Sequence, residues 1–153
     1  MTPADVPADS IYRQLLEHGQ EIDVPVTWRK FARPEVVYLG ECLPRTFRFL
    51  QRHATAAQTR AESFPIEHAH LVHGTMRAAK RRAWLRHAWV ELPGDIVFDG
   101  VVQRFYRRDS YYSIIGAHAL AEYSWTEARQ LASTPRRPYG PWHRRVDHHT
   151  KAP

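Results

Sequence analysis

Three side chains in this sequence could together carry out thiol-dependent acyl transfer: Cys42, His87 and Asp99. In that chemistry a thiolate attacks a carbonyl carbon, an imidazole moves the proton, and a carboxylate orients the imidazole. Cys42 is the sole cysteine of the 153 residues, and the other two side chains occur in the stretch HAWVELPGDIVFD. These groups can react as a unit only if the elements that carry them meet in the fold.

The cysteine is predicted to lie in the first turn of a helix. Phe47 and Leu50 follow it at helical spacing, Gly40 supplies a turn before it, and Pro44 fits only near a helix start. A thiol in this position lies at the positive end of the helix dipole, which favours the thiolate. Backbone N–H groups of the same turn are available to a developing oxyanion. One position can therefore supply both nucleophile and oxyanion hole.

The histidine and the aspartate are predicted to lie on neighbouring strands of a hairpin. HAWVEL alternates as a strand does, Pro93 to Asp95 form a turn, and IVFD returns as the second strand. If the loop consists of residues 93–95, Trp89 faces Asp99 across the hairpin, and His87 is a diagonal neighbour of Asp99 on the same face. A two-residue loop would place the two side chains on opposite faces.

A cysteine at a helix start, then HAW on a strand, then an aspartate after a hairpin resembles the papain-like and transglutaminase-like superfamily, especially its small bacterial members. The pieces CLPRTFRFL and HAWVEL are also similar to leader peptidases of lasso-peptide pathways. The resemblance covers roughly Tyr38 to Asp99. It implies Cys42 as nucleophile, His87 as general base and acid, and Asp99 as the group that orients the ring. The glutamine that papain-like proteases carry before the cysteine is missing from RPEVVYLGE.

The fold class expected from these patterns is α+β, with the cysteine-bearing helix packed on a small antiparallel sheet. The expected function is hydrolysis or transfer at an amide or peptide bond through a thioester on Cys42, without a cofactor. The substrate is expected to be a peptide or protein, and an acidic one would suit the basic chain. Four aromatic side chains are expected to line its cleft: Tyr38, Trp89, Tyr111 and Tyr112.

Alternatives from other classes remain open at this stage. Each of the three residues has a common structural role, so a catalytically silent interaction module on the same fold is one alternative to the enzyme. The chain carries 22 Lys and Arg against 16 Asp and Glu, a formal net charge of +6. Basic residues alternate with aromatic ones in KRRAWLR, RFYRR and PRRPYGPWHRR, a pattern typical of single-stranded nucleic acid binding.

A metal site is a weaker alternative. His68 and His70 share a face if their segment is a strand, and His87 would complete a set of three imidazoles for Zn²⁺. No carboxylate or second cysteine stands at metal-ligand spacing, so no metal is expected.

Composition indicates one globular domain over residues 1–153, since 43% of the residues are hydrophobic and 12% aromatic. A single cysteine fits a reducing compartment, and the sequence shows neither a signal peptide nor an apolar segment of spanning length, so a cytoplasmic location without membrane contact is expected. The oligomeric state is left open.

The remaining elements are predicted from local signals. A helix is expected to end at His18 before Gly19, a strand within PIEHAHLVHGTM, a further strand over Val101 to Phe105, and a helix opened by the capping pair Ser124 and Glu127. Residues 1–8 are expected to form a loose arm. Residues 134–153 are expected to form an extended basic tail, pinned to the body by aromatic side chains.

Overall fold

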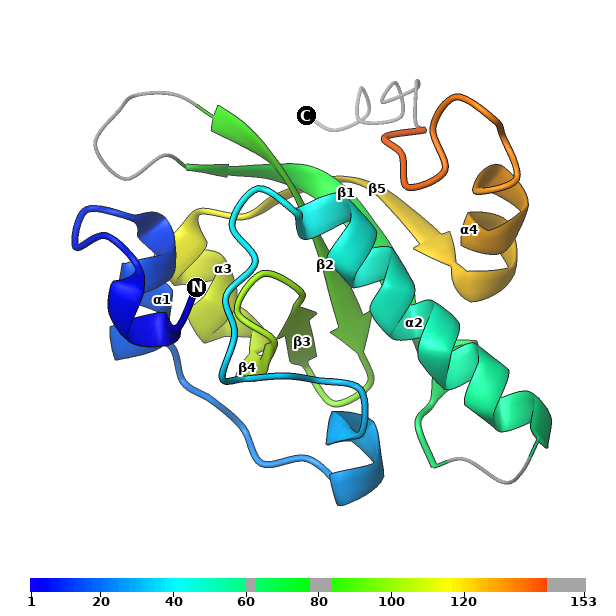
Figure 1. Cartoon of the computed structure of the whole chain (residues 1–153), viewed down its shortest axis with the longest axis horizontal. Helices are drawn as coiled ribbons and strands as arrows, with labels where there is room; N and C mark the ends of the chain where they lie inside the picture. The colour runs from blue at the N-terminus through cyan, green and yellow to red at the C-terminus, as the bar shows by residue number, and fades with distance from the viewer. Residues whose placement is uncertain (60–62, 78–83, 143–153) are drawn as a thin grey trace.

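The computed structural model describes residues 1–59, 63–77 and 84–142. This part of the chain folds into a five-stranded sheet with the strand order β4-β3-β2-β1-β5, in which every pairing is antiparallel (Figure 1). The strands are β1 (His70–Arg77), β2 (Trp84–Leu92), β3 (Ile96–Asp99), β4 (Arg104–Arg107) and β5 (His118–Ser124). The helices are α1 (Ile11–His18), α2 (Cys42–Thr59), α3 (Arg108–Ile115) and α4 (Trp125–Leu131), with short 3-10 turns at η1 (Pro3–Asp5), η2 (Val26–Arg29) and η3 (Ile66–His68). The α+β class expected from the sequence is confirmed.

Both faces of the sheet are covered. In Figure 1, α2 crosses the front of the sheet, α1 and α3 lie together beside it, and α4 follows β5 at the opposite side. One buried cluster joins Leu71 and Val90 to the side chains of α2, and the other joins Val72 and Trp89 to those of α1 and α3. Neighbouring residues of β1 and β2 thus enter different clusters, because successive side chains of a strand point to opposite faces. None of the described helices is long and apolar enough to cross a bilayer.

The end of α1 and the start of α2 lie where the sequence predicts them. The Ser10 side chain accepts a hydrogen bond from the Tyr12 N–H, and α1 ends at the cap residue Gly19. The chain passes through Gly40 at a φ of +80°, a conformation that suits glycine, and α2 then begins at Cys42. The buried side of α2 includes Phe49 and Leu50.

The hairpin of β2 and β3 has the register that a loop of residues 93–95 requires. Val90 pairs with Phe98, and Leu92 pairs with Ile96. Odd-numbered residues of both strands, which include His87 and Asp99, therefore share the face that α1 and α3 cover.

The strand predicted over Val101 to Phe105 is wrong at its start. Residues 101–103 form a turn, which the N–H of Gln103 closes by donating to the carbonyl of Asp99 over 2.7 Å, and β4 begins only at Arg104. The Asp99 carboxylate stabilises this turn because it accepts the N–H groups of Val101 and Val102. Two further elements, α3 and β5, were not predicted.

The ends of the chain pack more closely than expected. Val6 lies within the predicted loose arm but is only 2% exposed, and the Arg13 guanidinium donates to its carbonyl. At the other end, Tyr139 and Trp142 contact Phe47 of α2, as a pinned tail requires. Residues 143–153 lie outside the described residues.

Candidate active site

The first turn of α2 carries the thiol. Cys42 is the first residue of the helix and is partly buried, with one side against the cluster formed by α1, α3 and the sheet. It lies close enough to the His87 ring to be one of the groups that raise the pKa of His87. The structure thus brings together a thiol and an imidazole that are separated by more than one helix and one strand in the sequence.

The imidazole is held from both of its nitrogens. His87 lies in the middle of β2 and has no exposed surface. Its Nε2 lies 3.1 Å from Oδ2 of Asp99, and its Nδ1 lies 3.2 Å from the hydroxyl of Tyr12. Because Nε2 faces the carboxylate of Asp99, Nδ1, on the side of the Tyr12 hydroxyl, is the nitrogen that can exchange a proton with a neighbouring group.

The carboxylate that orients the ring is itself fixed by several donors. Oδ1 of Asp99 accepts the N–H groups of Val101 and Val102 at 2.8 and 3.0 Å. Oδ2 faces His87 and also accepts the Tyr111 hydroxyl at 2.5 Å. Asp99 has no exposed surface, so these contacts replace the water that a carboxylate otherwise needs.

Two tyrosines complete the buried network. Tyr111 comes from α3, and its hydroxyl lies 2.8 Å from Nε2 of His87 as well as bonding to Asp99. Tyr12 comes from α1 and reaches the opposite nitrogen of the ring. Sequence reasoning missed Tyr12 altogether. Its spacing from Leu15 marks it as an inward-facing residue of α1, but no local pattern connects it with His87.

The ionisation of the pair follows from these contacts. Burial alone would lower the pKa of His87. The hydrogen-bonding interactions of the ring with Asp99 and Cys42, together with the charges of these two groups, outweigh burial and raise the pKa of His87 to about 9. Burial raises the pKa of Asp99. The hydrogen bond and positive charge of His87 outweigh this effect, helped by hydrogen bonds from the Tyr111 hydroxyl and the Val102 N–H, so that the pKa of Asp99 lies below its usual value. At neutral pH the pair is an imidazolium and a carboxylate.

The raised pKa of His87 predicts a pH-dependent stability. Between pH about 6.5 and 9 the folded protein holds a proton on His87 that the unfolded chain has released, so the free energy of unfolding falls as the pH rises. The loss approaches roughly 3 kcal/mol at pH 9. Urea unfolding at pH 6 and pH 9 measures it. A His87→Gln variant should show a much smaller difference between the two pH values, whereas a His118→Gln variant, which removes an exposed histidine of β5, should behave like the parent.

The four aromatic residues expected to line the cleft lie in different surroundings. Trp89 and Tyr111 have no exposed surface and form the buried wall behind His87, so they do not contact a substrate in this conformation. Tyr112 is partly exposed, and its hydroxyl bonds to Glu91. Tyr38 lines a pocket, on the side of α2 that carries Arg45.

The histidines of the zinc alternative do not assemble. His68 lies in η3, His70 begins β1 and both are exposed, whereas His87 is buried and bonded to Asp99. Among residues 1–59, 63–77 and 84–142, no group of three His, Cys, Asp or Glu is placed to hold a metal ion.

The basic cluster RFYRR has acidic partners. Arg104 pairs with Glu21 at 2.8 Å and Arg108 with Glu91 at 3.0 Å. Arg107 lies 3.8 Å from the carboxylate of Asp109. Most of KRRAWLR, and the end of PRRPYGPWHRR, lie outside the described residues.

Known proteins offer no direct guide to this site. No model of a protein family matches the chain, and neither the curated proteins nor the solved structures contain a similar one. Any assignment of function must therefore come from the residues and their geometry.

Proposed function

We propose that the chain is a thiol-dependent hydrolase or acyltransferase that acts on an amide or peptide bond. The observation that carries the proposal is the contact of Cys42, at the start of α2, with the ring of His87, which in turn bonds to Asp99 over 3.1 Å. A buried carboxylate, an imidazole and a partly exposed thiol in series have the order of roles that nucleophilic catalysis requires. The resemblance to the papain-like and transglutaminase-like superfamily is part of the same proposal.

The first half of the reaction transfers the acyl group to sulfur. The Cys42 thiolate attacks the carbonyl carbon, and N–H groups that precede the intrahelical hydrogen bonds of α2 stabilise the oxyanion. When the C–N bond breaks, the imidazolium of His87 donates its proton to the leaving nitrogen. An amine departs, and a thioester remains on Cys42.

The second half regenerates the thiol. Acylation removes the negative charge of the thiolate, one of the influences that raise the pKa of His87, so the ring more readily remains neutral. The neutral imidazole takes a proton from water or from an acceptor amine while this nucleophile attacks the thioester. The C–S bond breaks, the acid or the new amide leaves, and the imidazolium beside the thiolate is restored.

Alkylation by iodoacetamide tests the thiol in the folded protein. Because His87 is cationic at neutral and mildly acid pH and lies beside Cys42, alkylation of the thiol should still be measurable at pH about 6. The rate of alkylation, followed by mass spectrometry between pH 5 and 9, should fall at pH 6 by at least about tenfold in a His87→Ala variant.

Removal of an unrelated histidine provides the control. His118→Ala, in β5, should leave the pH profile of alkylation unchanged. A thiol that reacts only after urea is added, at a rate that does not depend on His87, would show that Cys42 is structural and would overturn the proposal.

A further inference from the structure

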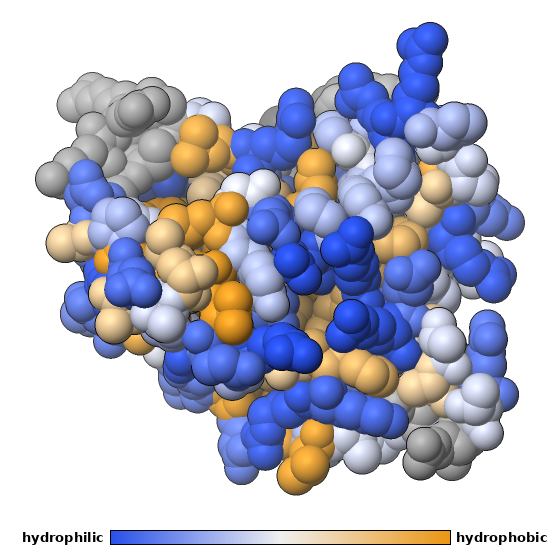
Figure 2. Space-filling view, in the orientation of Figure 1, coloured by the Kyte–Doolittle hydropathy of each residue, from blue (hydrophilic) through white to orange (hydrophobic). Residues whose placement is uncertain are grey.

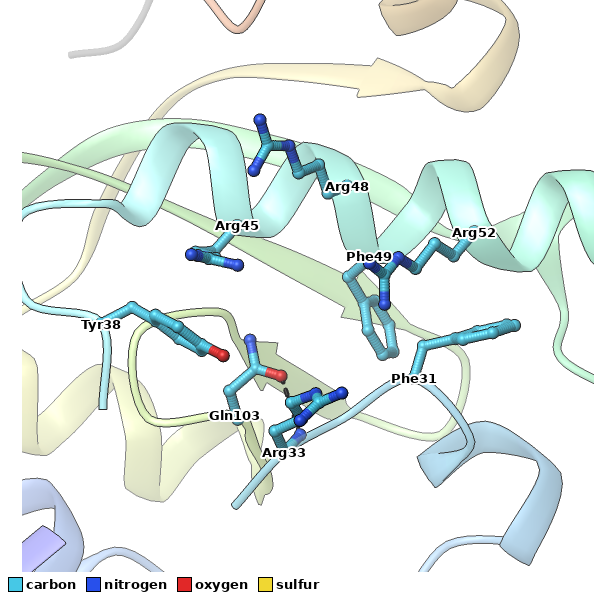
Figure 3. A pocket seen from close by; sticks show the side chains of 8 residues that line it. All are labelled: Phe31, Arg33, Tyr38, Arg45, Arg48, Phe49, Arg52 and Gln103. Atoms are coloured by element: carbon cyan, nitrogen blue, oxygen red, sulfur yellow. Dashed lines mark hydrogen bonds between the residues drawn. The ribbon is translucent and has the colours of Figure 1, made fainter. Parts of the chain in front are cut away.

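A pocket lined by four arginines lies along α2, beside the candidate active site. The segment before α2 forms its opposite wall and Gln103 its floor, and its cavity volume is about 60 Å³ (Figure 3). Its lining residues are Phe31, Arg33, Tyr38, Arg45, Arg48, Phe49, Arg52 and Gln103. Figure 2 shows hydrophilic side chains gathered across the middle of the same face. The pocket is therefore strongly cationic.

The arginines of the pocket are less neutralised than Arg104, Arg107 and Arg108, which all have carboxylate partners. Arg45 pairs with Glu41 at 2.8 Å, and Arg48 donates to the hydroxyl of Tyr139. Within the part of the chain that the structure describes, neither Arg33 nor Arg52 has an ion pair with a carboxylate, in contrast to the paired arginines of β4. An anionic ligand would supply the charge that the pocket lacks.

The frame of the pocket is rigid. Gln103 accepts the N–H of Arg33 at 2.9 Å and donates to the carbonyl of Gly100 at 2.8 Å, and it is only 6% exposed. The Arg45 guanidinium lies 3.7 Å from the centre of the Tyr38 ring, which fixes its plane. A guanidinium held in this way presents a fork of donors that matches a carboxylate.

Helix geometry relates the pocket to the thiol. Arg45 and Arg52 follow Cys42 by three and ten residues, so they lie about 4.5 and 15 Å further along the axis of α2. Because these two arginines are seven residues apart, they project from nearly the same side of the helix as each other. An extended peptide rises by about 3.3 Å per residue. A peptide whose carbonyl carbon lies at Cys42 and whose chain follows α2 would pass these arginines with residues about one to five positions away.

The aromatic side chains of the pocket are occupied. Arg45 covers Tyr38, Phe49 is stacked on Phe98 with the ring centres 3.7 Å apart, and Phe31 contacts the ring of His53. Single-stranded nucleic acid is held by bases stacked on free aromatic faces as well as by phosphate contacts. The pocket thus offers charge while the rings of Tyr38 and Phe49 are covered, which favours carboxylates over stacked bases.

We propose that this pocket recognises acidic side chains of the peptide substrate, about one to five residues from the bond that reacts. The proposal rests on the proposed function for the position of that bond, but recognition itself requires no reaction. Arg33 and Arg52 bind the carboxylates, and Arg45 orients the chain next to Cys42.

Calorimetric titration of a Cys42→Ala protein separates binding from catalysis. The probe is a blocked peptide of alternating glutamate and glycine, and its glutamine counterpart is the comparison. The glutamate peptide should bind at low salt, and the glutamine peptide at least about tenfold more weakly. Adding Arg33→Gln and Arg52→Gln should weaken binding of the glutamate peptide by at least about tenfold. The matched control, Arg107→Gln with Arg136→Gln, removes two exposed arginines elsewhere and should change the affinity less than about threefold.

The possible outcomes separate this inference from the proposed function. Equal affinity for the two peptides, or equal loss in both double variants, would overturn the pocket as a specific site even if Cys42 is reactive. If the glutamate peptide binds through the pocket but the thiol of Cys42 is inert, the proposed enzymatic function is overturned and the carboxylate-binding site is retained. An oligonucleotide of deoxythymidine that binds more tightly than the glutamate peptide, and depends on the same two arginines, would overturn the assignment to peptide carboxylates.

Discussion

Replacing Cys42 with alanine should abolish acetyl transfer from p-nitrophenyl acetate to the folded protein. The activated ester needs no substrate pocket, so it reports the nucleophile alone. The parent protein should release a burst of p-nitrophenolate and gain the mass of one acetyl group on Cys42. His87→Ala should slow the burst by about 10² to 10⁴-fold, because the ring assists formation of the thiolate. Stopped-flow absorbance and mass spectrometry measure the two quantities.

A surface variant provides the control for acetyl transfer. Arg107→Gln changes a side chain that pairs with the exposed Asp109, so its burst should equal that of the parent. Acetylation of the Cys42→Ala variant at the same rate and stoichiometry would show that another group is the nucleophile, and the proposed function would then fail.

The candidate triad could be inferred from sequence because each of its parts depends on short-range signals. The helix start at Cys42 follows from Gly40 and Pro44, which restrict the backbone locally. The placement of His87 and Asp99 on one face depends only on the length of the loop between two strands. The structure shows that loop length and that shared face.

The surrounding network could not be inferred, because its members come from distant parts of the chain. Tyr12 reaches His87 only because α1 packs against α3 on one face of the sheet. Tyr111 is an aromatic residue of the kind that often lines a cleft, but its position in α3 directs its side chain into the core, where its hydroxyl donates to Asp99. A contact of this kind depends on how helices and strands pack against one another, and the spacing of hydrophobic residues within one element does not specify that packing.

The misplaced third strand has a similar origin. Val101 and Val102 have high strand propensity, which favours an extended chain. The Asp99 carboxylate instead accepts both of their N–H groups and holds them in a turn, while Gln103 adopts a φ of +62°. One buried side chain thus outweighs the propensity of two residues, because it satisfies donors that would otherwise be buried without partners.

This dual role of Asp99 suggests why the site is built into the core of the domain. The carboxylate orients His87 with one oxygen and organises the turn before β4 with the other. The same turn carries Gln103, which forms the floor of the arginine pocket. The orientation of the imidazole and the shape of the pocket are therefore coupled through one buried residue.

Replacing Asp99 with alanine should destabilise the protein by about 3 to 5 kcal/mol, the cost of removing one partner from a buried ion pair. The substitution leaves His87 in the core without its carboxylate, and it leaves the N–H groups of Val101 and Val102 without their acceptor. A domain of ordinary stability would lose a large part of its total by this change. Urea unfolding at pH 7 measures the loss.

Comparison with Asp99→Asn separates the two roles. The amide oxygen of asparagine still accepts the N–H groups of the turn, so this variant should lose less stability than Asp99→Ala. In both variants the decline in stability from pH 6 to pH 9 should become smaller, because His87 loses its carboxylate partner. Asp109→Ala, at an exposed pair with Arg107, should cost less than about 1 kcal/mol. Two results would contradict this role of the buried pair: an Asp99→Ala variant as mild as Asp109→Ala, or an undiminished decline of stability with pH in the absence of the Asp99 carboxylate. In either case the imidazolium that the proposed reaction requires would have to be stabilised by Cys42 alone.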